Sequence, residues 1–262
     1  MVLGRDGRGR SVISVPSSGR SVSLSAEATA ITGDGRGTAF VSTRGGYFRF
    51  DVVSGAVSLT DVTDERDTDF TAIARRADGT LVLGSADGTV YTLDGDAAVR
   101  SRLRIFARVD ALVAQGDTVV VLDRGQTSVT EVDSSGTKAE QALRAGDGAT
   151  TIAADPRGRV LVADTRGDEL LVFGADPLIM RQRYPVPSAP YGLVGSSRLS
   201  WVSQTATNSV VGYDLSTGIP VEKVRYGTVQ QPDALAFDDA TSTLYVVSGS
   251  GAGVQVIAGA GA

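Results

Sequence analysis

Short apolar runs separated by turn residues recur along the whole chain. The clearest example is residues 155–173, DPRGRVLVADTRGDELLVF, where a DPRG turn precedes the run VLV and TRGD separates that run from LLVF. Proline fixes φ and glycine accepts a positive φ, so both favour a reverse turn. A short apolar run bounded by turns is typical of a strand that is buried on both faces. The pattern therefore predicts consecutive short strands, and no stretch has the apolar spacing of a helix.

The same unit repeats at intervals of about 40 residues, which is close to the roughly 40 to 50 residues of a four-stranded propeller blade. A small residue followed by an aliphatic one marks the first strand of each unit, and the aliphatic positions are Ile31, Ile73, Leu112, Ile152, Leu193 and Leu235. Their spacings are 42, 39, 40, 41 and 42 residues. A sandwich of two sheets would not explain such near-equal spacings. The sequence therefore predicts an all-β, six-bladed β-propeller with four antiparallel strands per blade.

The two ends of the chain suggest how the ring would close. The sixth unit stops after its third predicted strand, residues 254–257, so it lacks an outer strand. Residues 20–25 stand before the first unit, and we expect them to join the C-terminal blade as its closing strand. Residues 1–19 then form an N-terminal extension with no firm place, although residues 12–15 have the pattern of a strand. No linker separates the repeats, so residues 1–262 are predicted to form one domain.

Composition excludes several classes of function. The chain has no cysteine and no histidine, so catalysis by thiolate or imidazole is excluded, as is a zinc site built on either residue. The formal net charge is −5, and the arginines are scattered, so the basic footprint of a nucleic-acid-binding protein is missing. No apolar run is long enough to span a bilayer.

Two resemblances to known families are carried by particular residues. Gly158, the VAD run at 162–164 and the VF pair at 172–173 resemble the NHL-type repeat of β-propellers. Longer runs resemble the LppL-type lipoproteins of mycobacteria and their relatives: FTAIARR at 70–76, LVLGSADG at 81–88, VLDRGQTSV at 121–129, VVGYDLSTGIPVEKVRY at 210–226 and TLYVVSGSGAGVQVI at 243–257.

The second resemblance implies a location but no established activity. It implies an exported protein of the cell envelope, held on the outer face of the cytoplasmic membrane by a lipidated cysteine. Because this chain has no cysteine, we expect the anchor to lie upstream of it, and we expect the chain itself to be soluble and monomeric.

Two columns of polar residues are predicted at one mouth of the propeller channel, where the innermost strands begin and the second strands end. The first column stands two positions before each inner aliphatic residue: Thr29, Thr71, Asp110, Thr150, Tyr191 and Asp233. The second column ends the second strands: Thr43, Ser85, Asp123, Asp164, Gln204 and Ser248. Arg44 and Arg124 follow two members of the second column.

These side chains have two chemical interpretations and a structural one. Ca²⁺ prefers carboxylate and hydroxyl oxygens, so Asp110 and Asp233 are candidate metal ligands, and Asp123 and Asp164 could join them. Arg44, Arg108 and Arg124 could instead hold an anionic ligand by charge-assisted hydrogen bonds. The structural interpretation is that these groups satisfy backbone and channel water, as an aspartate at a strand end often does. We favour the structural interpretation, because buried polar groups must be hydrogen-bonded.

Other conspicuous residues favour structural roles. Trp201, the only tryptophan, stands on a second strand and is expected in the core. Arg75 and Arg76 are expected to be a solvated pair. We also expect the acidic segment 61–69 to be a solvated loop.

Three functions are compatible with this sequence. The preferred one is a binding or scaffold module with no catalytic residue, which engages an unknown protein or small-molecule ligand through its loop face. The alternative is a Ca²⁺-dependent hydrolase or lactonase, similar to the gluconolactonase and paraoxonase propellers, with its site at Asp110, Asp123, Gln204 and Asp233. A quinone-dependent dehydrogenase is the weakest option, because its tryptophan docking motifs are missing. We expect no cofactor, apart from Ca²⁺ in the alternative function.

Overall fold

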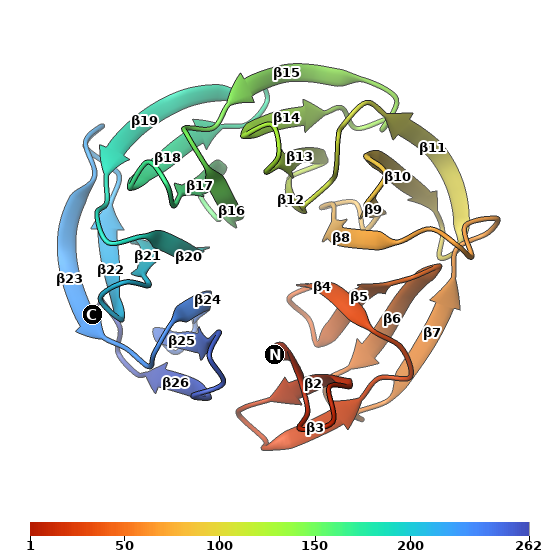
Figure 1. Ribbon diagram of the computed structural model, residues 1–262, viewed down its shortest axis with the longest axis horizontal. Coiled ribbons are helices and arrows are strands. Elements are labelled where there is room, and N and C mark those ends of the chain that lie inside the picture. The colour runs from red at the N-terminus through yellow and green to blue at the C-terminus, as the bar shows by residue number, and fades with distance from the viewer. Residues whose placement is uncertain (262) are drawn as a thin grey trace. The chain divides into compact units, whose positions relative to one another are not determined.

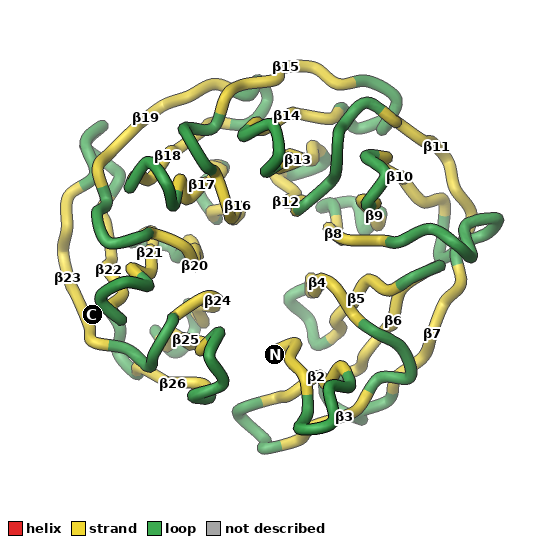
Figure 2. The backbone as a smooth tube through the Cα atoms, viewed as in Figure 1, coloured by secondary structure: helices red, strands yellow, loops and turns green. Residues whose placement is uncertain are grey.

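The computed structural model describes residues 1–261, which form seven antiparallel β-sheets in sequence order (Figure 1). Turns and loops connect the strands (Figure 2). None of the described residues belongs to a helix that could cross a membrane. Each of the five middle sheets has four strands in the described residues, whereas the first and the last have three.

The first three sheets occupy the N-terminal part of the chain. Their strands are β1 (Val2–Arg5), β2 (Ser11–Val15) and β3 (Arg20–Ser23); β4 (Ala28–Gly33), β5 (Thr38–Thr43), β6 (Gly46–Asp51) and β7 (Val57–Asp61); β8 (Phe70–Arg75), β9 (Leu81–Ser85), β10 (Thr89–Asp94) and β11 (Ala98–Arg104).

The remaining four sheets follow the same antiparallel order. Their strands are β12 (Ala111–Gln115), β13 (Thr118–Asp123), β14 (Ser128–Val132) and β15 (Ala139–Arg144); β16 (Ala149–Asp155), β17 (Arg159–Asp164), β18 (Glu169–Gly174) and β19 (Ile179–Pro185); β20 (Pro190–Gly195), β21 (Ser200–Gln204), β22 (Ser209–Asp214) and β23 (Val221–Gly227); β24 (Pro232–Asp238), β25 (Thr243–Ser248) and β26 (Val254–Ile257).

The fold is therefore an all-β propeller with seven blades of three or four strands, and the prediction of six blades is wrong. The additional blade is the sheet formed by β1, β2 and β3, where Leu3 pairs with Ile13 and Ile13 also pairs with Val22. This sheet has no fourth strand, and β4 begins only 5 residues after β3 ends. Its unit is much shorter than the repeat of about 40 residues expected for a full blade, so the spacing test did not detect it.

The predicted closing strand is also wrong. Residues 20–23 form β3, which pairs with β2 inside the first sheet. The last sheet has the order β24-β25-β26, and β26 pairs only with β25 among the described strands. The prediction of four strands in every blade fails for the same two sheets.

The chain divides into two compact units, which we describe separately. The first contains Met1–Gly125 and Val132–Glu140, and the second contains Gln126–Glu131 and the chain from Gln141 onward. In the first unit, apolar side chains of one sheet pack against those of the next. Ile13 of β2, for example, shares a core cluster with Val41 of β5 and Phe48 of β6, and all three are at most 1% exposed.

The second unit is built in the same way. Leu161 and Leu170 pack in one cluster with Val202 and Val211 of the following sheet. The runs VLV and LLVF that predicted strands are completely buried, and the following sheet covers Leu161, Leu170 and Val172. Trp201 is also completely buried, as expected, in a cluster with Leu244 and Val246.

Candidate functional site

The second column of predicted mouth residues consists of buried side chains that form hydrogen bonds with backbone groups of nearby loops. Asp164 is the clearest case, because it is 0% exposed and its carboxylate accepts three backbone N–H groups. The donors are Asp147 at 2.7 Å, Gly148 at 2.8 Å and Gly167 at 2.9 Å. Two of them belong to the loop that leads into β16. Asp164 therefore ties the incoming loop of its own sheet to the end of β17.

Four other members of this column make the same connection. The carboxylate of Asp123 accepts the N–H groups of Ala107 and Arg108, at 3.0 and 3.4 Å. Gln204 donates to the carbonyl of Pro187 at 2.7 Å, and the Thr43 and Ser248 hydroxyls each donate at 2.6 Å to the carbonyls of Glu27 and Gln230. Each acceptor or donor lies in the loop before the first strand of the same sheet. Ser85 differs, since its hydroxyl bonds to Asp87 and Thr89 within its own turn.

The first column is more varied. In the first unit, Thr29 donates to the carbonyl of Phe70 in the next sheet at 2.7 Å, and Thr71 donates to the carbonyl of Val109 in the loop that leads into the next sheet. Thr150 stays within its own sheet, where its hydroxyl contacts Thr165 at 2.5 Å. These threonines act as braces between or within sheets.

Asp110 belongs to a charged group in the first unit. Its side chain is 14% exposed and lies 3.2 Å from Nε of Arg108. Its other carboxylate oxygen accepts the backbone N–H of Arg124 at 2.8 Å. Arg124 is exposed, and its guanidinium has no partner among residues 1–261. The structure thus brings together three of the residues that we proposed for an anion or a cation.

Arg44, also in the first unit, forms ion pairs at the protein surface. Its side chain is 61% exposed and pairs with Asp67 at 3.1 Å and with Asp69 at 3.9 Å. Exposed ion pairs of this kind contribute little to stability. The acidic loop that supplies them is only partly solvated, because Glu65 is buried and bonds to Arg102 at 2.8 Å.

Asp233, in the second unit, differs from every other carboxylate of the two columns. No group of residues 1–261 bonds to its carboxylate, which lies directly on the backbone of Gly249: a Cβ added there would be 1.7 Å from Oδ2. Burial raises the pKa of this carboxyl above its ordinary value. Tyr191 occupies the matching position on β20, the neighbouring inner strand, and is partly buried.

The metal prediction names two residues that lie in different units, Asp110 in the first and Asp233 in the second. Within residues 1–261, no group of three or more acidic, histidine or cysteine side chains is placed to hold a metal ion. The carboxylates of Asp123 and Asp164 already accept backbone N–H groups. A Ca²⁺ site at these residues stays a prediction.

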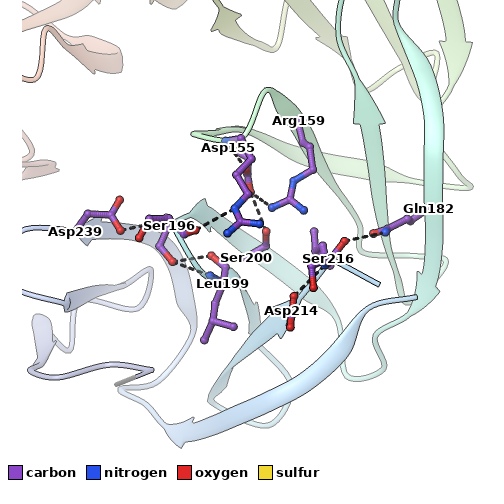
Figure 3. Close-up of polar contacts among 12 residues, drawn as sticks. Asp155, Arg159, Gln182, Ser196, Leu199, Ser200, Asp214, Ser216 and Asp239 are labelled. Atoms are coloured by element: carbon purple, nitrogen blue, oxygen red, sulfur yellow. Dashed lines mark hydrogen bonds and ion pairs between the residues drawn. The ribbon is translucent and has the colours of Figure 1, made fainter. Parts of the chain in front are cut away.

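A buried polar group at the opposite ends of the strands was missed by the sequence analysis (Figure 3). The carboxylate of Asp155 is completely buried. It contacts Arg159 at 2.8 Å, the hydroxyl of Ser200 at 2.9 Å and the N–H of Arg157 at 2.8 Å. The sequence showed Asp155 only as a turn residue, and nothing in it pairs Asp155 with Ser200 of the next sheet. This group joins two sheets of the second unit.

Comparison with known proteins shows the fold and nothing narrower. No protein-family model matches the chain, and no curated protein sequence matches it. A solved streptogramin B lyase has a TM-score of 0.75 at 9% identity, with 98% of this chain and 92% of that chain covered. A chain of a mitotic checkpoint complex has a TM-score of 0.78 at 12% identity, covering 98% and 89%. Virginiamycin B lyase from Staphylococcus aureus has a TM-score of 0.71 at 11% identity, covering 93% and 89%.

At such identities these structures support the propeller fold and carry no activity across. The resemblance to LppL-type lipoproteins, and the cell-envelope location that it implies, stay predictions.

Proposed function

We propose that the chain is a binding module, a rigid propeller of the cell envelope that engages a protein or a small ligand through the loops at the mouth residues. The observation that carries this proposal is how the mouth columns are used. Their buried members fasten the loops to the sheets, whereas each unit keeps side chains that no described residue binds: Arg124 in the first unit, and Tyr191 and Asp233 in the second. A rigid frame that presents a few free polar groups is suited to recognition, because little conformational entropy is lost on binding.

The structural neighbours are compatible with this function but do not select it. One of them was solved as part of a mitotic checkpoint complex, so the fold can serve in a protein assembly. The lyase neighbours offer less support for catalysis here. A variant of the Staphylococcus aureus lyase in which a histidine is replaced by alanine is described as catalytically inactive, and the present chain has no histidine.

Site-specific photocrosslinking in the producing cells would test the proposal. A photoreactive amino acid would replace Tyr191 or Arg124 at the mouth, or Arg36 as the control. Arg36 is exposed in the turn between β4 and β5, at the other ends of the strands. We expect discrete adducts from the two mouth positions and none from position 36. Absence of adducts at both mouth positions, or the same adducts from position 36, would contradict the proposal.

One observation favours the second candidate, a Ca²⁺-dependent hydrolase or lactonase. A carboxyl group with a raised pKa and no internal partner is a typical acid or base in catalysis, and Asp233 has both properties. Lactone hydrolysis that requires added Ca²⁺ and is lost in Asp233→Asn, but not in Arg36→Ala, would support this candidate. No turnover by the unmodified protein over a panel of lactones and esters would remove it.

A further inference from the structure

Two mouth residues of the second unit stand on neighbouring strands that are fastened to each other. Tyr191 belongs to β20 and Asp233 to β24, and these two strands pack together (Figure 1). The buried hydroxyl of Ser203 accepts the N–H of Gly192 at 2.7 Å and donates to the carbonyl of Pro232 at 2.5 Å. This bridge joins the residue after Tyr191 to the residue before Asp233, so the two side chains start from neighbouring points.

Both residues stand where the pairing of their strands is irregular. The register between β20 and β21 shifts at Tyr191, and the register between β24 and β25 shifts at Asp233. Such bulges re-aim a side chain and are frequent beside functional sites. The carbonyl of Tyr191 also accepts a hydrogen bond from the hydroxyl of Thr151 in the preceding sheet. The backbone of the pair is therefore held in place before any ligand binds.

The carboxylate of Asp233 borders an exposed segment and has no counter-ion. Its Oδ2 atom lies 1.7 Å from the place that a Cβ at Gly249 would occupy. Gly249 is exposed, and Asp233 is only partly buried. Burial raises the pKa of this carboxyl, and no cation in the described part of the chain pairs with it. A partly desolvated carboxylate without a partner is unfavourable, and a bound cation would compensate it.

Other charged groups of the mouth loops in this unit are bound within the chain. The carboxylate of Asp168 accepts the N–H of Ala189 at 2.9 Å. Arg166 donates from Nε to the carbonyl of Asp147 at 3.0 Å. The two side chains on β20 and β24, in contrast, bond to no residue within 1–261. They offer one negative charge and one aromatic ring.

We propose that Asp233 and Tyr191 bind a protonated amino group, either of a small amine or of a lysine side chain of a protein partner. This inference rests on the proposed binding function and names the chemistry of its ligand. The ammonium donates charge-assisted hydrogen bonds to the carboxylate of Asp233, and the ring of Tyr191 covers part of the cation. A single carboxylate suits a single positive charge, whereas Ca²⁺ takes roughly six to eight oxygen ligands.

Isothermal titration calorimetry on the purified chain would test this proposal. The ligands are ethylammonium chloride and a short peptide with a blocked N-terminus, whose one lysine is either free or acetylated, at constant pH and ionic strength. We expect saturable binding of ethylammonium or of the free-lysine peptide, and none of the acetylated peptide or of sodium chloride. Binding of ethylammonium indicates a small amine, and binding of the lysine peptide alone indicates a protein side chain.

Two variants decide whether the binding occurs at this carboxylate. Asp233→Asn removes the charge and should weaken binding by roughly tenfold or more. Asp239→Asn is its control, because Asp239 is an exposed carboxylate in the turn at the opposite end of β24, and it should leave the affinity unchanged.

Gly249→Ala keeps the charge but displaces the carboxylate, because the added methyl group would occupy its place. It should also weaken binding. Its control is Gly227→Ala, where an added Cβ meets no atom within 4 Å, and this variant should bind as the unmodified protein does. Equal melting temperatures of the two glycine variants would show that both are folded.

Several results would overturn the proposal. These are the absence of saturable binding of any amine, equal binding of the free and acetylated peptides, or unchanged affinity in Asp233→Asn or Gly249→Ala. Tight binding of Ca²⁺ that excludes the amine and is lost in Asp233→Asn would overturn it as well.

The outcome is separable from that of the proposed function. If no amine binds but the mouth positions still form discrete photoadducts, the ligand chemistry is wrong and the binding module stands. If an amine binds at Asp233 but no photoadduct forms, the ligand chemistry stands and the proposed cellular binding function fails.

Discussion

Asp164 illustrates how a residue placed like a ligand can belong to the frame of the fold. Its carboxylate is fully buried and accepts three backbone N–H groups. In Asp164→Ala these donors lose their acceptor, and an unsatisfied buried donor costs about 1–3 kcal/mol. Since water can reach some of them, we expect the free energy of unfolding to fall by roughly 2–4 kcal/mol. Urea denaturation measures this loss.

The neighbouring Asp147 is a suitable control for that variant. Among residues 1–261 its exposed carboxylate pairs only with Arg144, at 3.5 Å, while its backbone N–H still bonds to Asp164. Asp147→Ala should therefore change the stability by less than about 1 kcal/mol. Equal losses in the two variants would show that Asp164 is not a special anchor.

Replacement of Asp233 should instead stabilise the protein, because burial raises the pKa of this carboxyl. Above the raised pKa the folded protein holds a desolvated charge that the unfolded chain hydrates freely, so ionisation destabilises the fold. Asp233→Asn removes that charge and should melt at a higher temperature than the unmodified protein near neutral pH. The difference should disappear as the pH falls from the raised pKa to below the ordinary carboxyl value. A difference that is independent of pH would contradict the assignment.

The polar columns show what the sequence can and cannot tell about single residues. Register and spacing placed Asp123, Asp164 and Gln204 at strand ends, and the structure finds them there. The sequence could not show which groups they bind, because the loops that supply the donors vary in sequence and length. Arg76 was expected in solvent but is 1% exposed. Its partners are backbone carbonyl groups, and because every residue has one, the sequence cannot indicate which of them Arg76 binds.

At the scale of elements, single buried side chains hold the turns of adjacent sheets. Arg76, which directly follows β8, donates to the carbonyl groups of Ser134 at 2.5 Å and Asp133 at 2.9 Å, in the turn that precedes β15. Glu131 of β14 is also buried and accepts the N–H of Leu178 at 2.6 Å, in the turn before β19. A cation satisfies carbonyl groups in one place, and a carboxylate satisfies N–H groups in the other.

Loss of Arg76 should loosen one turn more than the rest of the chain. In Arg76→Ala we expect faster hydrogen exchange at the amides of Gly136, Thr137 and Lys138, and roughly 2–4 kcal/mol less stability, because two bonds to a charged group are lost. Arg75→Ala is the control, since Arg75 makes no bond to this turn. Exchange that rises equally everywhere would indicate global destabilisation and would contradict a local role.

The elements themselves were predicted unequally. Strands such as β17 and β18 were found because both faces of each are covered, which demands a continuous apolar run. The strand β1 was not found because its residues are half-buried or exposed, so burial imposes no clear pattern on them. The short polar turn after β3 then left no full-length repeat to detect.

At the scale of the whole molecule, the blade count leads to a direct test. In the first unit, Ile13 is 0% and Val15 is 5% exposed, and both pack in a cluster with Val41, Phe48 and Phe50. Deletion of residues 1–23 should uncover these aromatic side chains, each of which contributes about 1.5–3 kcal/mol when fully buried. We expect a lower urea midpoint and increased binding of an apolar fluorescent dye.

A shorter deletion separates the packing of β2 from a simple loss of chain. Removal of residues 1–9 takes away β1, of which no residue is fully buried, and leaves β2 and β3 in place. This variant should keep most of the stability and bind little dye, because Ile13 and Val15 still cover Phe48 and Phe50. If the longer deletion were as stable as the intact chain, the first sheet would be dispensable and six blades would suffice. If the first sheet is a structural blade, stability should fall in the deletion of residues 1–23, which removes the apolar strand β2, and not in the deletion of residues 1–9.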